Sequence, residues 1–440
     1  MCSLRGIIGI SVAVVGLACG GGDPDGNGNG NGNGNGNGNG NGNGNGNGNG
    51  DTDPTADTEP GEVIWTHDLD DRVHGSPVVV DGMLYITTDY GGHAAALDAA
   101  TGDVVWALED ADRNVAQSFN VVDGTAYYGV FDQNAHGIMA RDAATGEEIW
   151  DTRDLENLVF TAGVQASVAV RGGEVYVPYG GTLLAALSAE TGERLHWDAD
   201  EEELQAFVIE EGALRTPPTV VDGTVYAATD GGFVYAFDAP TGDEKWTFSD
   251  PEDDRGLFWP VTVEGGLAYV SSPTGLHALD VDTGEEEWFF ESERQLDTAT
   301  YEGTMATVSD GVVYFPSEEH GALIALDAET GDEIWQAPDF GDPLFSSPTV
   351  AGGVVFASTS ASDSELRALD ATTGELQWDT TLGELGSTSS PVVVDGIVYT
   401  ANSDGHVYAI DAGVDGSSED SRVLHGTTSH HHAWADQGEN

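Results

Sequence analysis

Few side chains in this sequence could do chemistry, and cysteine is the clearest case. Cys2 and Cys19 are the only two cysteines among 440 residues, and both lie within the first twenty. The rest of the chain therefore cannot hold a disulfide framework, a cysteine-ligated zinc site, C-x-x-C-H haem attachment or a cysteine nucleophile.

Cys19 stands at the end of a stretch with the pattern of an export signal. A short flank with Arg5 precedes an apolar run over residues 7–17, which is too short to span a bilayer comfortably. Residues 17–20, Leu-Ala-Cys-Gly, resemble the lipobox of exported lipoproteins, in which the chain is cut before the cysteine and the thiol is lipidated. We therefore expect a signal peptide over residues 1–19 and anchorage to the outer face of the cell membrane through lipidated Cys19. An ordinary signal peptide with an incidental cysteine is the alternative.

Two further patterns resemble metal sites but depart from them. Residues 23–28 begin like a calcium-binding loop, yet the twelfth position would be Gly34 rather than glutamate. The run from His430 to His432 offers imidazole ligands, but consecutive histidines near a chain end coordinate poorly, and no carboxylate spacing accompanies them. We expect no metal site.

The charge of the chain narrows the class of partner. There are 77 Asp and Glu residues against 13 Lys and Arg, and the formal net charge is −64. No basic patch can form, which excludes binding to nucleic acid or to an anionic membrane surface. Lys245 is the only lysine, and such one-sided acidity suits high salt, where screening weakens like-charge repulsion. We expect the protein to come from an extreme halophile.

Composition separates a tether from a folded part. Residues 20–60 include a Gly-Asn alternation from Gly26 to Gly50 that has no apolar side chain to bury, which predicts a disordered linker. Over the whole chain 39% of residues are hydrophobic, including 10 tryptophans, and this is enough apolar area for a large core. The folded part is predicted over residues 61–412, followed by an acidic, histidine-containing tail over 413–440.

An internal repeat decides the fold class. In the first unit, residues 76–86 read SPVVVDGMLYI, residues 96–102 read ALDAATG, and Trp106 follows. The aspartate of the second half, or its equivalent, recurs every 41 to 50 residues, at Asp98, Asp142, Ser188, Asp238, Asp280, Asp327, Asp370 and Asp411. The chain therefore contains eight units.

Each unit is predicted to be a four-stranded antiparallel sheet. Asp-Gly or Gly-Gly pairs such as Asp81-Gly82 separate two β-branched runs, and these pairs accept the positive φ angles of a type I′ hairpin turn. The strands of the first unit are expected at about 76–80, 83–88, 93–98 and 103–108. Eight such sheets predict an all-β, eight-bladed β-propeller.

The ring is expected to close by sharing one blade between the two ends of the folded part. The last unit runs through residues 410–412 but lacks the following Thr-Gly and tryptophan, and residues 61–65 supply that missing segment. The N-terminal strand should therefore complete the last blade and remove an exposed sheet edge. Residues 421–424 are the alternative source of that strand.

The repeated A-L-D-A-x-T-G-x-x-x-W unit resembles the tryptophan-docking motif of the pyrroloquinoline quinone (PQQ)-like propeller repeat family. The resemblance covers residues 61–412 and departs from the motif at Ser188 and at the plain Gly61 turn. It implies that a tryptophan from each unit packs between blades as part of the core, namely Trp65, Trp106, Trp150, Trp197, Trp246, Trp288, Trp335 and Trp378. A buried indole contributes about 150–250 Å² of contact area, so these residues are expected to stabilise the ring.

The same family includes quinone-dependent dehydrogenases as well as non-catalytic scaffold lipoproteins, so the fold alone does not give the function. The resemblance implies that a dehydrogenase holds PQQ between a tryptophan and a vicinal disulfide, coordinates calcium with Glu, Asn and Asp, and uses an Asp base. This chain cannot form that disulfide, and its repeats stay near minimal length except over residues 198–214, which are mostly acidic. We expect no catalytic residue and no bound cofactor.

Residues at the entrance to each innermost strand are expected to line the central funnel, in the order His74, Gln117, Gln165, Arg215, Trp259, Tyr301, Phe345 and Thr388. Arg215 and Trp259 come from successive blades and could hold an anionic or planar ligand by charge and stacking, and His74 could add a titratable group. Ordinary funnel lining is the alternative.

These observations favour an exported, lipid-anchored, monomeric propeller that binds other surface proteins without catalysis. It resembles the scaffold branch of the family, which includes the propeller lipoprotein of the bacterial outer-membrane assembly machinery. A PQQ-dependent alcohol or sugar dehydrogenase is one alternative, and a solute-binding module for sugars or peptides is another.

Overall fold

The computed structural model describes residues 58–418, except for gaps at 74, 89–92, 110–113, 116–117, 132–135, 155–166, 180–182, 196–206, 215, 251–258, 293–304, 318–321, 338–343, 345, 360–363, 384 and 387–388. Cys19, the Gly-Asn segment and the histidine run fall outside the described residues. In the part of the chain that is described, no helix is long and apolar enough to cross a membrane.

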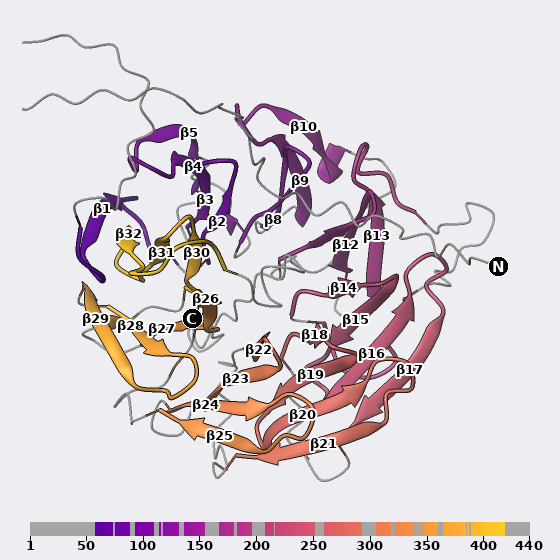
Figure 1. Cartoon of the computed structure of the whole chain (residues 1–440). Coiled ribbons are helices and arrows are strands. Elements are labelled where there is room, and N and C mark those ends of the chain that lie inside the picture. The colour runs from indigo at the N-terminus through magenta and orange to yellow at the C-terminus, as the bar shows by residue number, and fades with distance from the viewer. Residues whose placement is uncertain are drawn as a thin grey trace, which may run out of the picture. The chain divides into compact units, whose positions relative to one another are not determined.

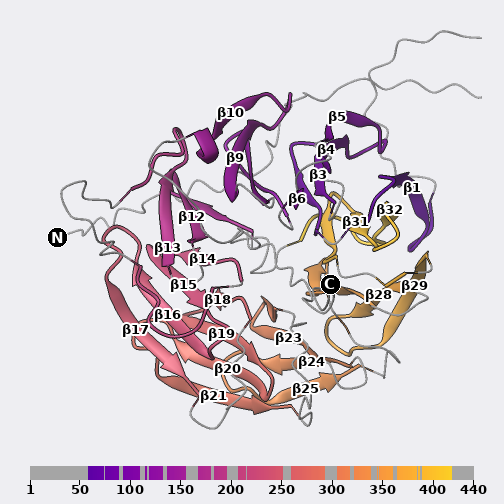
Figure 2. The same cartoon turned by 180° about the vertical axis from the view of Figure 1, so that it is seen from behind.

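Eight antiparallel sheets follow one another around a ring (Figure 1), and Figure 2 shows the same ring from behind. We number these blades in the chain order of their innermost strands. Blade 1 consists of β2 (Val78–Val80), β3 (Met83–Thr87), β4 (His93–Asp98) and β5 (Val104–Glu109). Blade 2 consists of β6 (Asn114–Val115), β7 (Asn120–Val122), β8 (Thr125–Phe131), β9 (His136–Asp142) and β10 (Glu148–Asp151). Blade 3 consists of β11 (Ala169–Arg171), β12 (Glu174–Tyr179) and β13 (Leu183–Ser188), and blade 4 of β14 (Thr219–Val221), β15 (Thr224–Ala228), β16 (Phe233–Asp238) and β17 (Glu244–Ser249). Blade 5 consists of β18 (Thr262–Glu264), β19 (Leu267–Ser272), β20 (Gly275–Asp280) and β21 (Glu286–Glu291), and blade 6 of β22 (Thr307–Ser309), β23 (Val312–Ser317), β24 (Ala322–Asp327) and β25 (Glu333–Gln336). Blade 7 consists of β26 (Thr349–Ala351), β27 (Val354–Ser358), β28 (Ser364–Asp370) and β29 (Leu376–Gly383). Blade 8 consists of β30 (Val392–Val394), β31 (Ile397–Ala401), β32 (His406–Asp411) and β1 (Val63–Asp68).

The ring closes as the sequence predicts. The innermost strands contact one another in the cyclic order β2, β7, β11, β14, β18, β22, β26, β30 and back to β2. Blade 8 has the strand order β1-β32-β31-β30, and β1 pairs antiparallel with β32 from Val63 opposite Ile410 to Asp68 opposite His406. The eight-bladed propeller and its closure by the N-terminal strand are both confirmed. The alternative donor, residues 421–424, lies outside the described residues.

Two blades differ from the regular four-stranded form. In blade 2 the short strand β6 pairs with the far end of β8 beside β7, so this sheet has five strands. A 3-10 turn, η1 (Thr152–Asp154), follows β10. Blade 3 has three described strands, and an isolated bridge between Leu187 and Arg194 marks the start of a fourth. Residues 196–206, which follow this bridge, lie outside the described residues.

The first hairpin turn of every blade has the predicted conformation. In blade 1, Asp81 has a φ of 51° and Gly82 a φ of 76°, the left-handed pair that a type I′ turn requires. The Asp-Gly and Gly-Gly pairs of the other seven blades are likewise both at positive φ. These pairs set the register between the first and second strands of each blade.

The hydrophobic core is divided among the seams between blades. Between blades 1 and 2, for example, Tyr85 and Trp106 from one sheet pack against Phe119 and Tyr128 from the next. Every blade therefore buries both of its faces, and no blade has a complete core of its own.

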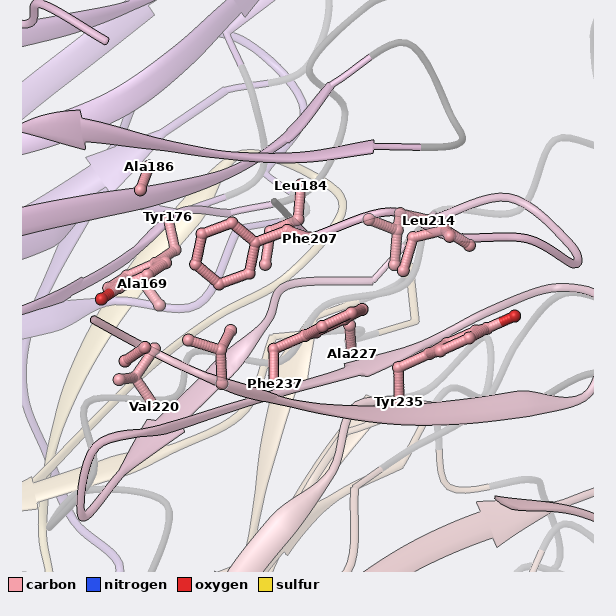
Figure 3. Close-up of a cluster of buried hydrophobic side chains, with 13 residues drawn as sticks. Ala169, Tyr176, Leu184, Ala186, Phe207, Leu214, Val220, Ala227, Tyr235 and Phe237 are labelled. Atoms are coloured by element: carbon pink, nitrogen blue, oxygen red, sulfur yellow. The ribbon is translucent and has the colours of Figure 1, made fainter. Parts of the chain in front are cut away.

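The seam between blades 3 and 4 contains an element that the sequence did not reveal (Figure 3). Phe207 lies in a cluster between Tyr176 and Leu184 of blade 3 and Phe237 of blade 4. Its ring meets that of Tyr176 edge-on at 6.0 Å, and its N–H donates to the Gly242 carbonyl at 3.0 Å. Phe207, near the end of the extended acidic segment over 198–214, is thus part of the buried packing in this seam.

Candidate functional site

The aspartate of each repeat caps the turn that follows the third strand. In blade 7, the Oδ1 atom of Asp370 accepts the N–H groups of Thr372 and Thr373, at 3.0 and 2.9 Å, and the Thr373 hydroxyl at 3.1 Å. The hydroxyl and these N–H groups hold the pKa of Asp370 below its ordinary value, because they stabilise the carboxylate. The same effect lowers the pKa of Asp142, Asp280 and Asp327. These carboxylates are structural caps.

The repeat tryptophan joins each blade to the next one. Trp335 of blade 6 donates its indole N–H to the carbonyl of Ala371 in blade 7 at 3.0 Å, and its ring lies against Gly374. A Cβ placed on Gly374 would lie 2.6 Å from the ring atom Cε3, so only glycine leaves room for the indole. The other tryptophans whose indole donates to a carbonyl of the next blade are Trp65, Trp106, Trp150, Trp246 and Trp288.

A tyrosine supports the same contact. Tyr314 donates its hydroxyl to the Ala371 carbonyl at 3.4 Å and lies 6.0 Å from Trp335 at an interplanar angle of 49°. Burial raises the pKa of Tyr314 to about 12, so the phenol remains a proton donor at any ordinary pH. Equivalent tyrosine bonds to the next blade come from Tyr85, Tyr127, Tyr269 and Tyr399.

The closing seam uses this contact across the ends of the folded part. Trp378 of blade 7 packs against Gly61, whose built Cβ would lie 2.9 Å from the ring. The Thr380 hydroxyl donates to the Gly61 carbonyl at 2.5 Å. Trp197, the remaining repeat tryptophan, falls outside the described residues.

The inner wall of the ring has a belt of buried serines whose hydroxyls accept N–H groups from neighbouring blades. Ser390 donates its N–H to the Ser76 hydroxyl, Ser76 donates to Ser118, and Ser347 donates to Ser390, each at 3.0 Å. Met305 donates to Ser347 at 3.1 Å. This serine belt thus links five blades.

Prolines interrupt the serine belt in blades 4 and 5, where Pro217 and Pro260 stand five residues before the first turn. A proline has neither an N–H nor a hydroxyl to join the belt. Threonine bonds link these blades instead: Thr219 donates its hydroxyl to the Val261 carbonyl and Thr262 to the Ala306 carbonyl, both at 2.6 Å.

The predicted funnel residues are not seen together. The side chain of Trp259 belongs to a residue that is 3% exposed, so the described chain presents no open indole face at this point. The backbone N–H of Trp259 donates to the Ser271 carbonyl at 3.2 Å. His74 and Arg215 fall outside the described residues, as do Gln117, Gln165, Tyr301, Phe345 and Thr388. A ligand site formed by His74, Arg215 and Trp259 stays a prediction.

Sequence reasoning missed a cluster around His277. This side chain is 1% exposed and stacks on Phe289 at 4.5 Å; its Nδ1 lies 2.8 Å from Glu286 Oε2 and its Nε2 lies 3.2 Å from Ser272 Oγ. The order Ser-His-Glu is that of a hydrolase triad, but Ser272 Oγ already accepts the N–H groups of Thr274 and Gly275 inside the β19–β20 turn. The cluster therefore supports a hairpin. No sequence motif marks it, because its members meet only through strand pairing.

The described residues contain no group of three or more His, Cys, Asp or Glu side chains that could hold a metal ion. The arrangement that the family resemblance implies for a quinone needs a disulfide of adjacent cysteines, calcium ligands and an accessible tryptophan. The chain lacks the cysteines, and Trp259 is buried. Within the described part of the chain, these residues do not supply the pair that the resemblance implies for holding the quinone.

Comparison with known proteins identifies the family. The repeat family described as "Outer membrane protein assembly factor BamB" matches residues 55–152, 134–291 and 272–433. The chain belongs to this PQQ-like propeller family.

Relatives of this PQQ-like propeller have different functions. A serine/threonine-protein kinase AfsK from Streptomyces griseus is 31% identical over 43% of this chain and 23% of its own length. The dehydrogenase subunit of a quinone alcohol dehydrogenase from Komagataeibacter europaeus is 24% identical over 62% of this chain and 34% of its own length. An assembly factor BamB from Salmonella typhimurium is 30% identical over 41% of this chain and 39% of its own length. The chain thus spans less than two fifths of each of these relatives, which include a non-enzyme as well as enzymes.

Solved structures show the same fold in both branches. BamB from Moraxella catarrhalis has a TM-score of 0.60 at 18% identity and covers 80% of this chain and 99% of its own. The quinohemoprotein alcohol dehydrogenase from Comamonas testosteroni has a TM-score of 0.63 at 18% identity and covers 80% of this chain and 77% of its own. At this identity the likeness shows the fold alone.

Proposed function

We propose that this PQQ-like propeller is a non-catalytic, protein-binding platform, exported through its N-terminal signal and held at the cell surface by lipidated Cys19. One observation carries the proposal: the polar side chains of the repeat are used to cap turns and to join blades. The aspartates cap turns, the tryptophans and tyrosines bond to the next blade, and the serines form the inner belt. What remains for function is the surface of the ring, which suits recognition of another macromolecule.

The acidity of the chain sets the conditions under which such a platform works. At a net charge of −64 the surface repels itself strongly unless salt screens it, and the Debye length is about 3 Å in 1 M salt. We therefore place the protein in a halophilic cell, as a monomer tethered by residues 20–60 to the outer face of the membrane. Its partners would be other surface proteins.

A PQQ-dependent dehydrogenase is the second candidate, because several of the matched proteins are quinone or quinohemoprotein alcohol dehydrogenases. The missing cysteine pair and the buried Trp259 count against it. The shared fold does not decide between the two candidates, because the BamB structure has it as well.

The two candidates separate in a titration of the purified protein with PQQ and calcium in molar salt. Tryptophan fluorescence measures binding, and dye reduction with alcohols and aldose sugars measures turnover. We expect no binding at micromolar PQQ and no dye reduction. Micromolar binding with turnover that disappears in Trp259→Ala would replace the platform with an enzyme.

The platform has its own test in native membranes. Cross-linking in molar salt, followed by recovery of the propeller, should give the same cross-linked surface protein in repeated preparations with wild-type protein. A Cys19→Ser variant, which would lose the anchor, is the matched control and should give much less of it. Equal recovery with the variant would show that the contact does not depend on anchorage at the membrane.

A further inference from the structure

Blade 8 is bonded on its innermost edge by a segment that follows the repeats. Gly396 in the β30–β31 turn donates its N–H to the Gly416 carbonyl at 2.7 Å, and Ser418 donates its N–H to the Val393 carbonyl at 2.8 Å. Asp395 donates its N–H to the Ser417 hydroxyl at 3.0 Å. Residues 413–418, which we call the strap, thus lie along β30 on the edge opposite β31.

The apolar side chain of the strap, Val414, fits a packing site at the seam between blades 7 and 8. Val414 packs against a buried cluster that includes Ala351, Val393 and Ala412. A Cβ placed on Gly352 of the neighbouring blade would lie 2.9 Å from Val414 Cβ, so the glycine leaves the space that Val414 fills. The strap therefore contacts blades 7 and 8 together.

Ser418 bonds to both blades of this seam. In the seam between blades 6 and 7, the hydroxyl of Thr307 donates to the Pro348 carbonyl at 2.8 Å. The hydroxyl of Thr349, the equivalent residue of blade 7, donates to the hydroxyl of Ser418 at 3.1 Å. Ser418 Oγ also accepts the Val393 N–H at 2.8 Å and donates to the Val393 carbonyl at 3.2 Å. Every donor and acceptor position of this hydroxyl, which belongs to a residue 7% exposed, is used.

We propose that the inner edge of β30, with Gly352 and Thr349, is a peptide-binding site of the strand-addition type, and that the strap is the ligand it holds in the resting chain. Main-chain bonds supply affinity in this mode, and pockets for alternate side chains supply specificity. Val414, Gly416 and Ser418 are the alternate residues here. The ligand class is thus an extended peptide with an apolar residue, a glycine and a serine at alternate positions. These contacts are the same whether the propeller is a scaffold or an enzyme.

Glycine at position 416 is required by its backbone. Its φ is +95°, a region that side chains rarely adopt, yet a Cβ there would meet no atom within 4 Å. Gly416→Val should therefore release the strap through backbone strain alone, and it leaves the residues of β30 and Gly352 that hold the strap unchanged. This variant keeps the full chain and opens the site.

The experiment measures binding of a labelled peptide with the sequence of residues 413–420, GVDGSSED, by fluorescence anisotropy in molar salt. We expect binding in the micromolar to millimolar range to the full-length Gly416→Val protein. Binding to the wild-type protein should be at least tenfold weaker, because the tethered strap competes at high effective concentration. Replacing the serine at position 418 of the peptide by alanine should cost about tenfold, the loss expected for a buried hydroxyl with three bonds.

Amide hydrogen exchange provides a second measurement on the same proteins. The amides of Val393 and Gly396 should exchange faster in Gly416→Val than in the wild type, and added peptide should slow them again, while the amide of Val398 in β31 stays unchanged. Equal binding to both proteins, equal binding of a scrambled peptide, or unchanged exchange at Gly396 would each overturn the proposal. So would faster exchange that millimolar peptide fails to reverse.

Discussion

The repeat tryptophan packs on a glycine of the next blade, so replacing that glycine should lower the free energy of unfolding by a predictable amount. Blade 7 contains two glycines that can be compared. Gly374 has a φ of +70° and a built Cβ 2.6 Å from the Trp335 ring, whereas Gly353 has a φ of +77° and no atom within 4 Å. Alanine costs about 1–2 kcal/mol of left-handed strain at either position. At Gly374 it must also displace an indole fixed by the bond to Ala371, and such overpacking costs about 1–3 kcal/mol.

Gly374→Ala should therefore lower the free energy of unfolding by about 2–5 kcal/mol and Gly353→Ala by about 1–2 kcal/mol. Urea unfolding in molar salt measures both, provided that the slope of the transition stays the same. In a Trp335→Phe background the smaller ring should bring the penalty of Gly374→Ala down towards that of Gly353→Ala. Equal destabilisation by the two alanines, or no coupling to Trp335, would refute the docking argument.

Three further predictions concern the anchor, salt and alkaline pH. Cys19→Ser should move the protein from the membrane fraction to the medium or leave it unprocessed, as shown by fractionation and mass; unchanged partition of the mature chain would contradict lipidation. Dilution from molar salt to about 0.1 M lengthens the Debye screening from about 3 Å to about 10 Å, so the melting temperature should fall, and a flat or rising value would contradict the halophile assignment. Burial raises the pKa of Tyr226 and Tyr314 from the ordinary value of 10 to about 12. Between these two pH values the folded state binds more protons than the unfolded state, so the free energy of unfolding should decrease as pH rises from about 10 to about 12. Tyr314→Phe should make that decrease smaller than in the wild type, and an identical pH profile in the two proteins would count against a buried phenol.

Much of the fold could be read from the sequence because its signals are local. Each hairpin turn and each aspartate cap lies within a single repeat unit. The glycine on which a tryptophan packs lies at a fixed position in the next unit. Eight copies then leave one arrangement, a closed ring, and the incomplete last unit with its complement at Gly61 predicts where the ring joins. Repetition made these inferences strong, since each unit tests the reading of the others.

The candidate sites depended on contacts that no local pattern marks. Burial of Phe207 between blades 3 and 4 could not be foreseen in an acidic segment, because it depends on the space beside Tyr176. The carboxylate beside His277 became visible only when β20 and β21 were paired. Trp259, expected to line the central funnel, is buried, and its burial depends on how neighbouring blades pack.

The sequence by itself thus determined the number of blades, their turns, the tryptophan positions and the point of closure, because each follows from short-range chemistry repeated along the chain. The tertiary structure alone decided which polar groups are used up between blades and which edge the strap covers. Thr349 and Ser418 are 69 residues apart, yet they share one hydrogen bond. Such a contact follows from closure of the ring, which brings the chain after the last repeat onto the inner edge of β30.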